Sequence, residues 1–113
     1  MTSDDEPRDD EACFVISVAA RMVGMHAQTL RYYERAGLVT PSRSRGRRRL
    51  YSPADIGRLR EIQRLTTDLG VNLAGVDVIF RMRQRLLVLE AELEETRRAL
   101  QRLRDRRLPA PRE

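Results

Sequence analysis

Apolar residues recur at helical spacing over most of the chain, and one central segment interrupts them. The first two periodic stretches are short, and each ends at a glycine, Gly24 and then Gly37. A β-prone run at residues 14–16 precedes them, and Ser17 is predicted to cap the first helix. Since a turn of only about three residues separates the two stretches, the pattern predicts a helix-turn-helix. The residues predicted to face inward are Val18, Ala19, Met22, Val23, Leu30, Tyr33 and Ala36.

The central segment, residues 38–51, has no helical period. Short β-prone runs flank Gly46, which predicts a β-hairpin, called the wing below. The hairpin is loaded with positive charge, and five cations within seven residues repel one another unless an anion lies close by. The five wing arginines are Arg43, Arg45, Arg47, Arg48 and Arg49.

A strong helix start follows the wing. Ser52 is a good N-cap, Pro53 suits the first helical position, and Asp55 completes a capping box. One apolar face then continues to Leu69, and Gly70 ends this helix. Asn72 is predicted to cap the next helix, whose first inward residues are Leu73, Val76, Ile79 and Phe80.

The strongest periodic signal lies between residues 76 and 108, which contain neither glycine nor proline. A heptad pattern over about four repeats predicts a coiled-coil seam, and seven of its eight positions are apolar. The same period also fits a single helix packed on its own domain, but a helix this long extends past so small a domain. The predicted dimerisation residues are Ile79, Met82, Leu86, Leu89, Leu93, Thr96, Leu100 and Leu103.

Charge order along this helix favours an antiparallel partner. Acidic residues at 90–95 come before a run of arginines at 97–107. A parallel homodimer sets like charges side by side, whereas an antiparallel pair centred near residue 98 sets Glu92 opposite Arg104 and Glu90 near Arg106. Each exposed pair contributes only about 0.2–1 kcal/mol. We therefore expect an antiparallel homodimer.

Composition narrows the function classes. The chain has 113 residues and a net charge of +5, and all 22 of its basic residues are arginine, which codon bias in a GC-rich genome explains. Residues 1–20 hold six acids against one arginine, while residues 21–64 hold eleven arginines against three acids. So short a chain has little room for an enzyme's pocket. The lone Cys13, expected to pack as a small apolar residue, excludes an internal disulfide or a cysteine zinc cluster. We expect no cofactor, no metal and no catalytic residue.

The N-terminal residues are acidic and almost without apolar side chains. They predict a disordered tail at residues 1–12, and their charge is opposite to that of a signal peptide. No apolar run has the length of a membrane span. We expect a cytoplasmic protein with a winged helix-turn-helix domain at 13–82, a coiled-coil helix at 83–108 and a tail at 109–113.

Several segments resemble the DNA-binding domain of MerR-family transcriptional regulators. They are Ile16–Ala20, Thr29–Leu38 (TLRYYERAGL) and Arg49–Ser52 followed by Asp55–Ile56. Two further segments, at residues 24–31 and 70–76, are similar to the HspR-type heat-shock repressors of that superfamily. The resemblance implies a mainly α fold: a winged helix-turn-helix with a small β wing, followed by an antiparallel dimerisation coiled coil.

The resemblance and the physical roles of the residues predict a DNA-contact surface. The second helix enters the major groove, where Gln28 suits adenine and Thr29 a thymine methyl or a phosphate. Tyr32 is expected to face DNA and Tyr33 the core. His26 stands at an N-cap position as a weak cap, and either a DNA contact or a simple surface role fits it. The predicted contact residues are Ser17, His26, Ala27, Gln28, Thr29, Arg31, Tyr32, Arg35, Arg43, Arg45, Arg47, Arg48, Arg49 and Tyr51.

The resulting hypothesis is a homodimeric repressor of heat-shock and chaperone genes that binds an inverted repeat in double-stranded DNA. HspR-type repressors use a DnaK-type chaperone as co-repressor, and the resemblance implies the same partner here. Three alternatives stay open: a MerR-type activator, a DNA-bending recombination factor, and a chaperone-binding adaptor that uses the winged domain as a scaffold.

Overall fold

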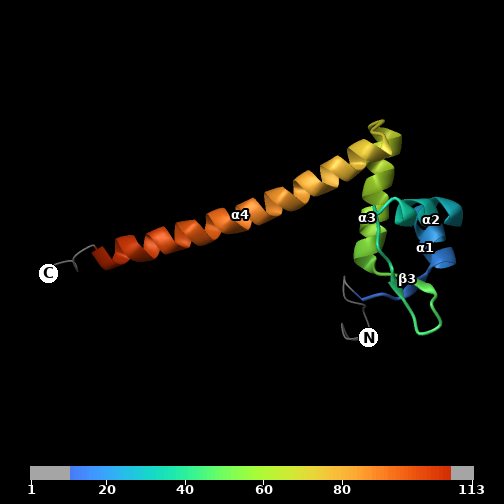
Figure 1. Ribbon diagram of the computed structural model, residues 1–113, viewed down its shortest axis with the longest axis horizontal. Helices are drawn as coiled ribbons and strands as arrows, with labels where there is room; N and C mark the ends of the chain where they lie inside the picture. The colour runs from blue at the N-terminus through green and yellow to red at the C-terminus, as the bar shows by residue number, and fades with distance from the viewer. Residues whose placement is uncertain (1–10, 108–113) are drawn as a thin grey trace. The chain divides into compact units, whose positions relative to one another are not determined.

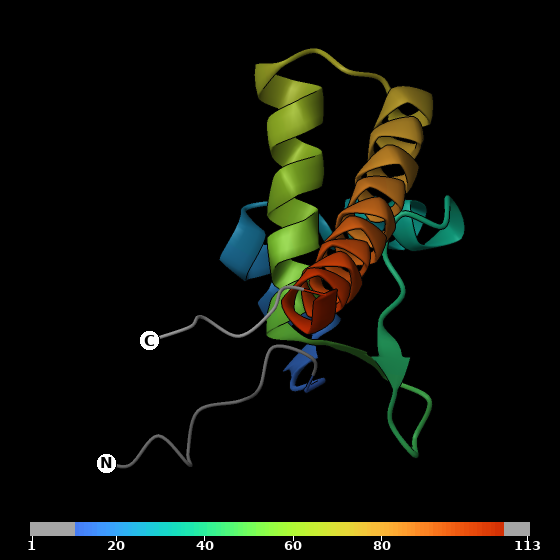
Figure 2. The same cartoon turned by 90° about the vertical axis from the view of Figure 1, so that its left-hand side faces the viewer.

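A computed structural model describes residues 11–107 (Figures 1 and 2). Residues 1–10 of the predicted acidic tail lie outside the described residues, as do Leu108 and the predicted tail at 109–113. The architecture is mainly helical with one small sheet, as the sequence predicted. The elements are β1 (Phe14–Val15), α1 (Ile16–Val23), α2 (Ala27–Arg35), β2 (Ser42–Arg43), β3 (Arg49–Tyr51), α3 (Pro53–Gln63), η2 (Arg64–Asp68) and α4 (Leu73–Arg107).

Helix α1 begins one residue before the predicted cap. Val15 is the N-cap and supplies no side-chain hydrogen bond, so the prediction that Ser17 caps the helix was wrong. The reason is that β1 runs directly into the helix, and Val15 already pairs with Leu50 in the sheet. The helix ends as predicted at Gly24, whose φ of 67° is left-handed.

The inward face of α1 is narrower than predicted. Ala19, Ala20 and Val23 are buried, whereas Val18 and Met22 are more than one-third exposed. Small side chains on the buried face let α1 approach both α2 and α3 closely, and α1 packs against both.

Helix α2 completes the helix-turn-helix. Leu30 and Tyr33 are buried, and Tyr32 is 50% exposed, which confirms the predicted division between the two tyrosines. Ala36 is exposed and not inward as predicted, because the helix has already reached its C-cap there.

The sheet has the strand order β1–β3–β2, and both pairings are antiparallel. The hairpin of β2 and β3 was predicted, but the pairing of β1 with β3 was not. Phe14 lies opposite Tyr51 in that pairing. The wing therefore grows from a strand that is bonded on both edges, and β1 holds its base against α1.

Helix α3 starts at the predicted capping box, in which Ser52 and Asp55 bond each other's backbone N–H groups at 2.9 and 3.0 Å. The turn that continues it, η2, is wider than a turn of α-helix. The N–H of Leu69 bonds the carbonyl of Arg64 at 3.2 Å, five residues back, and residues 64–68 form a π-helix. The extra residue in this turn rotates Leu69 off the buried face. Leu69 is 59% exposed, which corrects its predicted inward position.

Helix α4 is continuous from Leu73 to Arg107, and Asn72 caps it through a 2.7 Å bond from the N–H of Gly75. The chain separates into a compact unit that ends at Val76 and a second unit from Asp77 onward. Both this division and the predicted boundary at residue 82 fall inside one helix. No helix within residues 11–107 combines the length and apolar composition that crossing a membrane requires.

Candidate nucleic-acid interface

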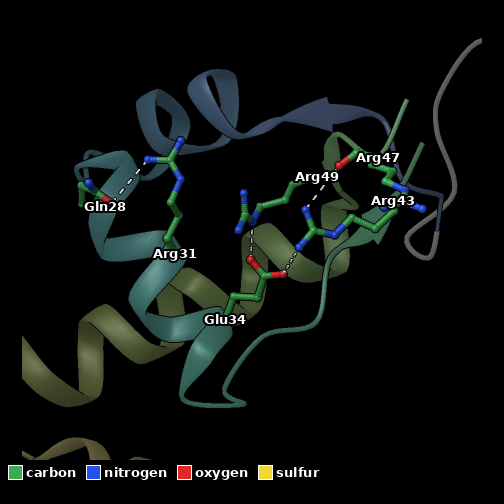
Figure 3. A network of polar contacts seen from close by, with 6 residues as sticks. All are labelled: Gln28, Arg31, Glu34, Arg43, Arg47 and Arg49. Carbon is green, nitrogen blue, oxygen red and sulfur yellow. Dashed lines mark hydrogen bonds and ion pairs between the residues drawn. The ribbon is translucent and has the colours of Figure 1, made fainter. Parts of the chain in front are cut away.

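One face of α2 is polar, aromatic and turned to solvent. Gln28, Arg31, Tyr32 and Arg35 follow the spacing i, i+3, i+4, i+7, so their side chains leave the same side of the helix. Arg31 is partly buried and the other three are exposed. Arg31 Nη1 donates to Gln28 Oε1 at 3.4 Å, so these two side chains meet on the same surface (Figure 3). The structure thus brings together four of the predicted contact residues.

His26 caps the N-terminus of α2. Its Nδ1 accepts a hydrogen bond from the N–H of Gln28 at 3.2 Å, and its backbone is extended, as an N-cap requires. The ring is exposed beside the first turn of the helix. The residue that sequence reasoning treated as a weak cap is therefore the functioning one, and the bond requires an unprotonated Nδ1.

A shallow hollow of about 460 Å³ runs along the neighbouring side of α2. The predicted contact residue Thr29 lines it. Its walls come from α2, from η2, from the loop before α4 and from the first residue of α4, and they are Gln28, Thr29, Tyr32, Tyr33, Thr66, Val71, Asn72 and Leu73.

The wing turn is closed by backbone bonds and by Ser44. The N–H of Arg47 donates to the carbonyl of Ser44 at 2.9 Å, and Ser44 Oγ accepts from the N–H of Arg48 at 3.2 Å. The left-handed position of this turn belongs to Arg47, whose φ is 63°, and not to Gly46. A residue with a Cβ at such a left-handed position lowers the stability of the fold by about 1 kcal/mol relative to glycine.

Glu34 ties the wing to α2. Its carboxylate accepts from Arg43 Nη2 at 2.8 Å and, through its other oxygen, from Arg49 Nε (Figure 3). The side chain of Glu34 is only 20% exposed, and charge-assisted bonds are stronger where water is partly excluded. Sequence reasoning missed Glu34. Its one signal was an acid inside the most basic part of the chain.

The five wing arginines therefore divide into two groups. Arg43 and Arg49 are bound to Glu34. The remaining three are exposed at the turn, and within residues 11–107 their side chains form no ion pair; they are Arg45, Arg47 and Arg48. We call these three the tip arginines. They carry the uncompensated positive charge of the wing.

Tyr51 does not lie on this surface. It is fully buried, so its predicted place among the DNA-contact residues is corrected: it supports β3 from inside the core. Its hydroxyl has no hydrogen-bond partner among the described residues. Burial is the main cause that raises the pKa of Tyr51; Glu34 and Asp55 raise it further, while Arg49 and Arg43 oppose them.

Cys13 is exposed, which corrects the prediction that it packs as an apolar residue. Partial desolvation, followed by the charge of Glu11, raises the pKa of its thiol. Among the described residues, no three His, Cys, Asp or Glu side chains gather as metal ligands do.

The predicted coiled-coil seam lies along α4 with its apolar side chains exposed. Met82 is 62% exposed and Leu103 is 56% exposed, and the seam positions between them are exposed as well. Glu94 and Glu95 pair with Arg98 and Arg102 of the same helix at 3.3–4.0 Å.

The acids and arginines that were predicted to pair between helices have no partner on their own helix. Glu90, Glu92, Arg104 and Arg106 form no ion pair within residues 11–107. No opposite charge stands three or four residues away from any of them among the described residues.

Comparisons with known proteins agree with this arrangement. The family model of the MerR helix-turn-helix regulatory proteins matches residues 14–83. A Streptomyces coelicolor protein that carries the name heat shock protein HspR is 46% identical over 95 residues, which cover 84% of this chain and 63% of that protein. The chain thus spans less than two thirds of the length of this relative. The transcriptional regulator GlnR of Bacillus anthracis is 35% identical over 92 residues, covering 81% of this chain and 70% of GlnR.

Solved structures share the fold. HiNmlR, a MerR family regulator that lacks the sensor domain and was crystallised on promoter DNA, has a TM-score of 0.58 and 22% identity over 81% of this chain and 76% of its own. PbrR691 from Ralstonia metallidurans, crystallised with lead(II), has a TM-score of 0.59 and 24% identity over 89% and 92% of the two chains.

Proposed function

The chain belongs to the MerR family of helix-turn-helix regulatory proteins, and on this basis we propose that it is a sequence-specific DNA-binding repressor of heat-shock and chaperone genes. One observation carries the DNA-binding part. The exposed face of α2 and the three tip arginines form the two contact surfaces of a winged helix-turn-helix, and Glu34 links them. The identity of 46% with HspR supports the heat-shock role.

In this proposal α2 lies in the major groove. Gln28 releases Arg31 and reads adenine through its amide, while Arg31 and Arg35 contact a guanine edge or phosphates. Thr29 lies beside them at the edge of the hollow, within reach of a thymine methyl or a phosphate. His26 caps α2 and Ala27 is its first residue, so both stand at the start of this surface. Ser17 is exposed in the first turn of α1 and is proposed as a further DNA contact.

The functional unit is an antiparallel homodimer formed through α4. The exposed seam supplies the apolar contact, and the unpaired charges set the direction. Centring the pair near residue 98 brings Glu92 to Arg104 and Glu90 to Arg106 of the second copy. Two identical domains related by a two-fold axis read an inverted repeat.

Selection from a random DNA pool, followed by titration at several salt concentrations, tests this function. If each protomer neutralises about four phosphates, log K falls with log[salt] with a slope of roughly −7 for the dimer. We expect the pool to yield an inverted repeat. No enriched sequence, or a slope near −2, contradicts the proposal.

The genomic position of the bound sites separates the roles. Sites that overlap chaperone-operon promoters favour a repressor. Sites that lie between unusually spaced promoter elements favour an activator, and sites at attachment loci favour a DNA-bending recombination factor. Genome-wide footprinting of the bound DNA, with and without a DnaK-type chaperone, tests whether that chaperone is the co-repressor, as the likeness to HspR suggests. An adaptor keeps its activity when the tip arginines become alanine, whereas a repressor loses it. The proposed location is the cytoplasm, on the nucleoid.

A further inference from the structure

The tip of the wing places an arginine where the backbone favours glycine. Arg47 has a φ of 63°, while Gly46, directly before it, lies outside the left-handed region. A Cβ on Gly46 meets nothing nearer than Ser44 Oγ at 3.9 Å, so position 46 accepts a side chain. Exchanging the two residues relieves the backbone at unchanged composition. Strain that is kept at such a place indicates that the side chain at position 47 has a task.

The backbone of Arg47 is also tied to α2. Arg43 Nη1 donates to the carbonyl of Arg47 at 3.4 Å, and Nη2 of the same guanidinium bonds Glu34 at 2.8 Å (Figure 3). A single side chain thus joins the turn of the wing to the helix that presents Gln28 and Arg31. The position of Arg47 is therefore fixed relative to the base-reading face, as a sequence-reading contact requires.

The wing is shaped to deliver one side chain and not a strand. Its turn projects beyond the helices of the domain in both views (Figures 1 and 2). The minor groove of B-DNA is about 6 Å wide, whereas neighbouring strands are already about 4.8 Å apart without their side chains. The hairpin as a whole does not fit, but one extended arginine does. Narrow A·T-rich minor grooves attract arginine through their enhanced negative potential.

We infer that Arg47 enters the minor groove beside the bases read by α2 and selects A·T pairs there, while Arg45 and Arg48 contact phosphates. This inference rests on the proposed function, because it requires α2 to lie in the major groove. It adds a second readout, which acts on groove shape and on the minor-groove edge.

The test uses an operator selected from a random pool with the wild-type protein. Affinity is measured on three versions that carry A·T, G·C or inosine·C pairs at the positions facing the wing. Inosine lacks the 2-amino group of guanine, so an inosine·C pair shows the minor-groove edge of A·T and the major-groove edge of G·C. We expect the wild type to bind the A·T and inosine·C versions equally and the G·C version about tenfold more weakly.

The matched variant exchanges Gly46→Arg and Arg47→Gly, which keeps the net charge and puts glycine at the left-handed position. We expect it to melt at a higher temperature than the wild type and to bind all three versions equally. Arg47→Asn, which tolerates left-handed backbone without a charge, is the second variant and is expected to lose the preference as well.

Three results overturn the inference: equal wild-type affinity for all versions, an inosine·C version that behaves like G·C, or a variant that keeps the wild-type preference. A pool that yields no enriched sequence contradicts the proposed function instead, so the two failures are distinguishable.

Discussion

The carboxylate of Glu34 on α2 accepts a hydrogen bond from the guanidinium of Arg49 on β3. The two residues are 15 positions apart, and neither side chain is more than 28% exposed. Together with the bond from Arg43, this contact joins α2 to the wing. It converts two of the five wing arginines from contacts with an external anion into internal supports.

Glu34→Gln is expected to loosen this joint. The amide keeps the size of the side chain but removes the charge that both guanidinium groups share, and we expect a loss of about 1 kcal/mol in unfolding free energy. In a domain of this size that lowers the melting temperature by about 4–8 °C. Removing a negative charge next to the wing is also expected to raise affinity for random DNA at low salt, so that the ratio of specific to non-specific affinity falls.

Glu61→Gln is the matched control, since Glu61 on α3 pairs at 2.7 Å with Arg64, the first residue of η2 and only three positions away. We expect a change below about 0.5 kcal/mol in stability there and no change in the ratio. Equal effects of the two variants contradict the role of Glu34 as the joint between helix and wing.

Tyr51→Phe is expected to leave the fold intact and to increase its stability. The buried hydroxyl has no partner among the described residues, and an unsatisfied buried polar group costs about 1–3 kcal/mol. Thermal unfolding measures the difference. Because the residue is fully buried, the DNA affinity of Tyr51→Phe is expected to stay within twofold of the wild type. A larger loss of affinity would indicate that the hydroxyl contacts DNA directly.

The same variant tests the pH dependence. The pKa of Tyr51 is raised in the folded protein, mainly by burial, so above the unfolded value of about 10 the unfolded chain releases this proton first. The contribution of the neutral phenol is complete below that pH and is lost as the pH rises through the folded value. We expect stability to fall more steeply above pH ~10 in the wild type than in Tyr51→Phe. Parallel curves contradict this assignment.

Local signals explain which parts of the fold were predictable. The capping box at Ser52 and Asp55, and the glycine that ends α1, each act within a few residues of themselves, and both are where the sequence placed them. The heptads of α4 repeat one signal over a long distance, and with the cap at Asn72 they predicted the helix up to Arg107, the last described residue. What failed depends on a neighbour: β1 pairs with a strand 35 residues later, and this pairing moves the start of α1 away from Ser17.

The candidate site shows the same division. Helical spacing alone identified the exposed face of α2, including the separation of Tyr32 from Tyr33. Spacing does not show which wing arginine meets Glu34, because that depends on how the hairpin folds back to α2. Nor does it show that Tyr51, at the end of a three-residue strand, faces the core and not the surface of the predicted DNA contacts. The π-turn at residues 64–68 has no sequence signal of its own and moved Leu69 to the surface.

His26→Ala is expected to destabilise the start of α2 by about 0.5–1 kcal/mol, because the N–H of Gln28 loses its acceptor. His26→Ser restores an acceptor of the preferred kind and is expected to match or exceed the wild type. Amide hydrogen exchange at Gln28 measures the cap directly. Equal exchange in the alanine and serine variants contradicts a capping role. If serine restores the cap but not DNA affinity, the ring itself contacts DNA.

Removal of residues 2–11 tests whether the acidic N-terminal tail, which lies mostly outside the described residues, weakens DNA binding. This segment carries six acids and one arginine. Two residues after it, the backbone N–H of Cys13 donates to the carbonyl of Tyr51 on β3 at 3.1 Å. About ten residues of extended chain reach roughly 33 Å, enough to bring acids to the tip arginines. We expect the shortened chain to bind random DNA more tightly at 50 mM salt and equally at 300 mM, where screening acts within a shorter distance. If the shortened and full-length chains bind random DNA equally at 50 mM salt, the acidic segment does not compete with DNA for the tip arginines.

Charge reversal tests the direction of the coiled coil. In the antiparallel register Glu92 meets Arg104 of the second copy, and two-fold symmetry makes each such pair occur twice. Glu92→Arg alone, or Arg104→Glu alone, turns both attractions into repulsions and is expected to weaken the dimer by about tenfold. The double variant restores the attraction with its sign exchanged and is expected to return close to wild-type affinity.

Glu94→Arg is the control, since Glu94 pairs within its own helix with Arg98 at 3.3 Å, and its reversal is expected to lower helix stability more than dimer affinity. Sedimentation equilibrium measures the wild type and all four variants, and a double variant that dimerises more weakly than both single variants contradicts the antiparallel register.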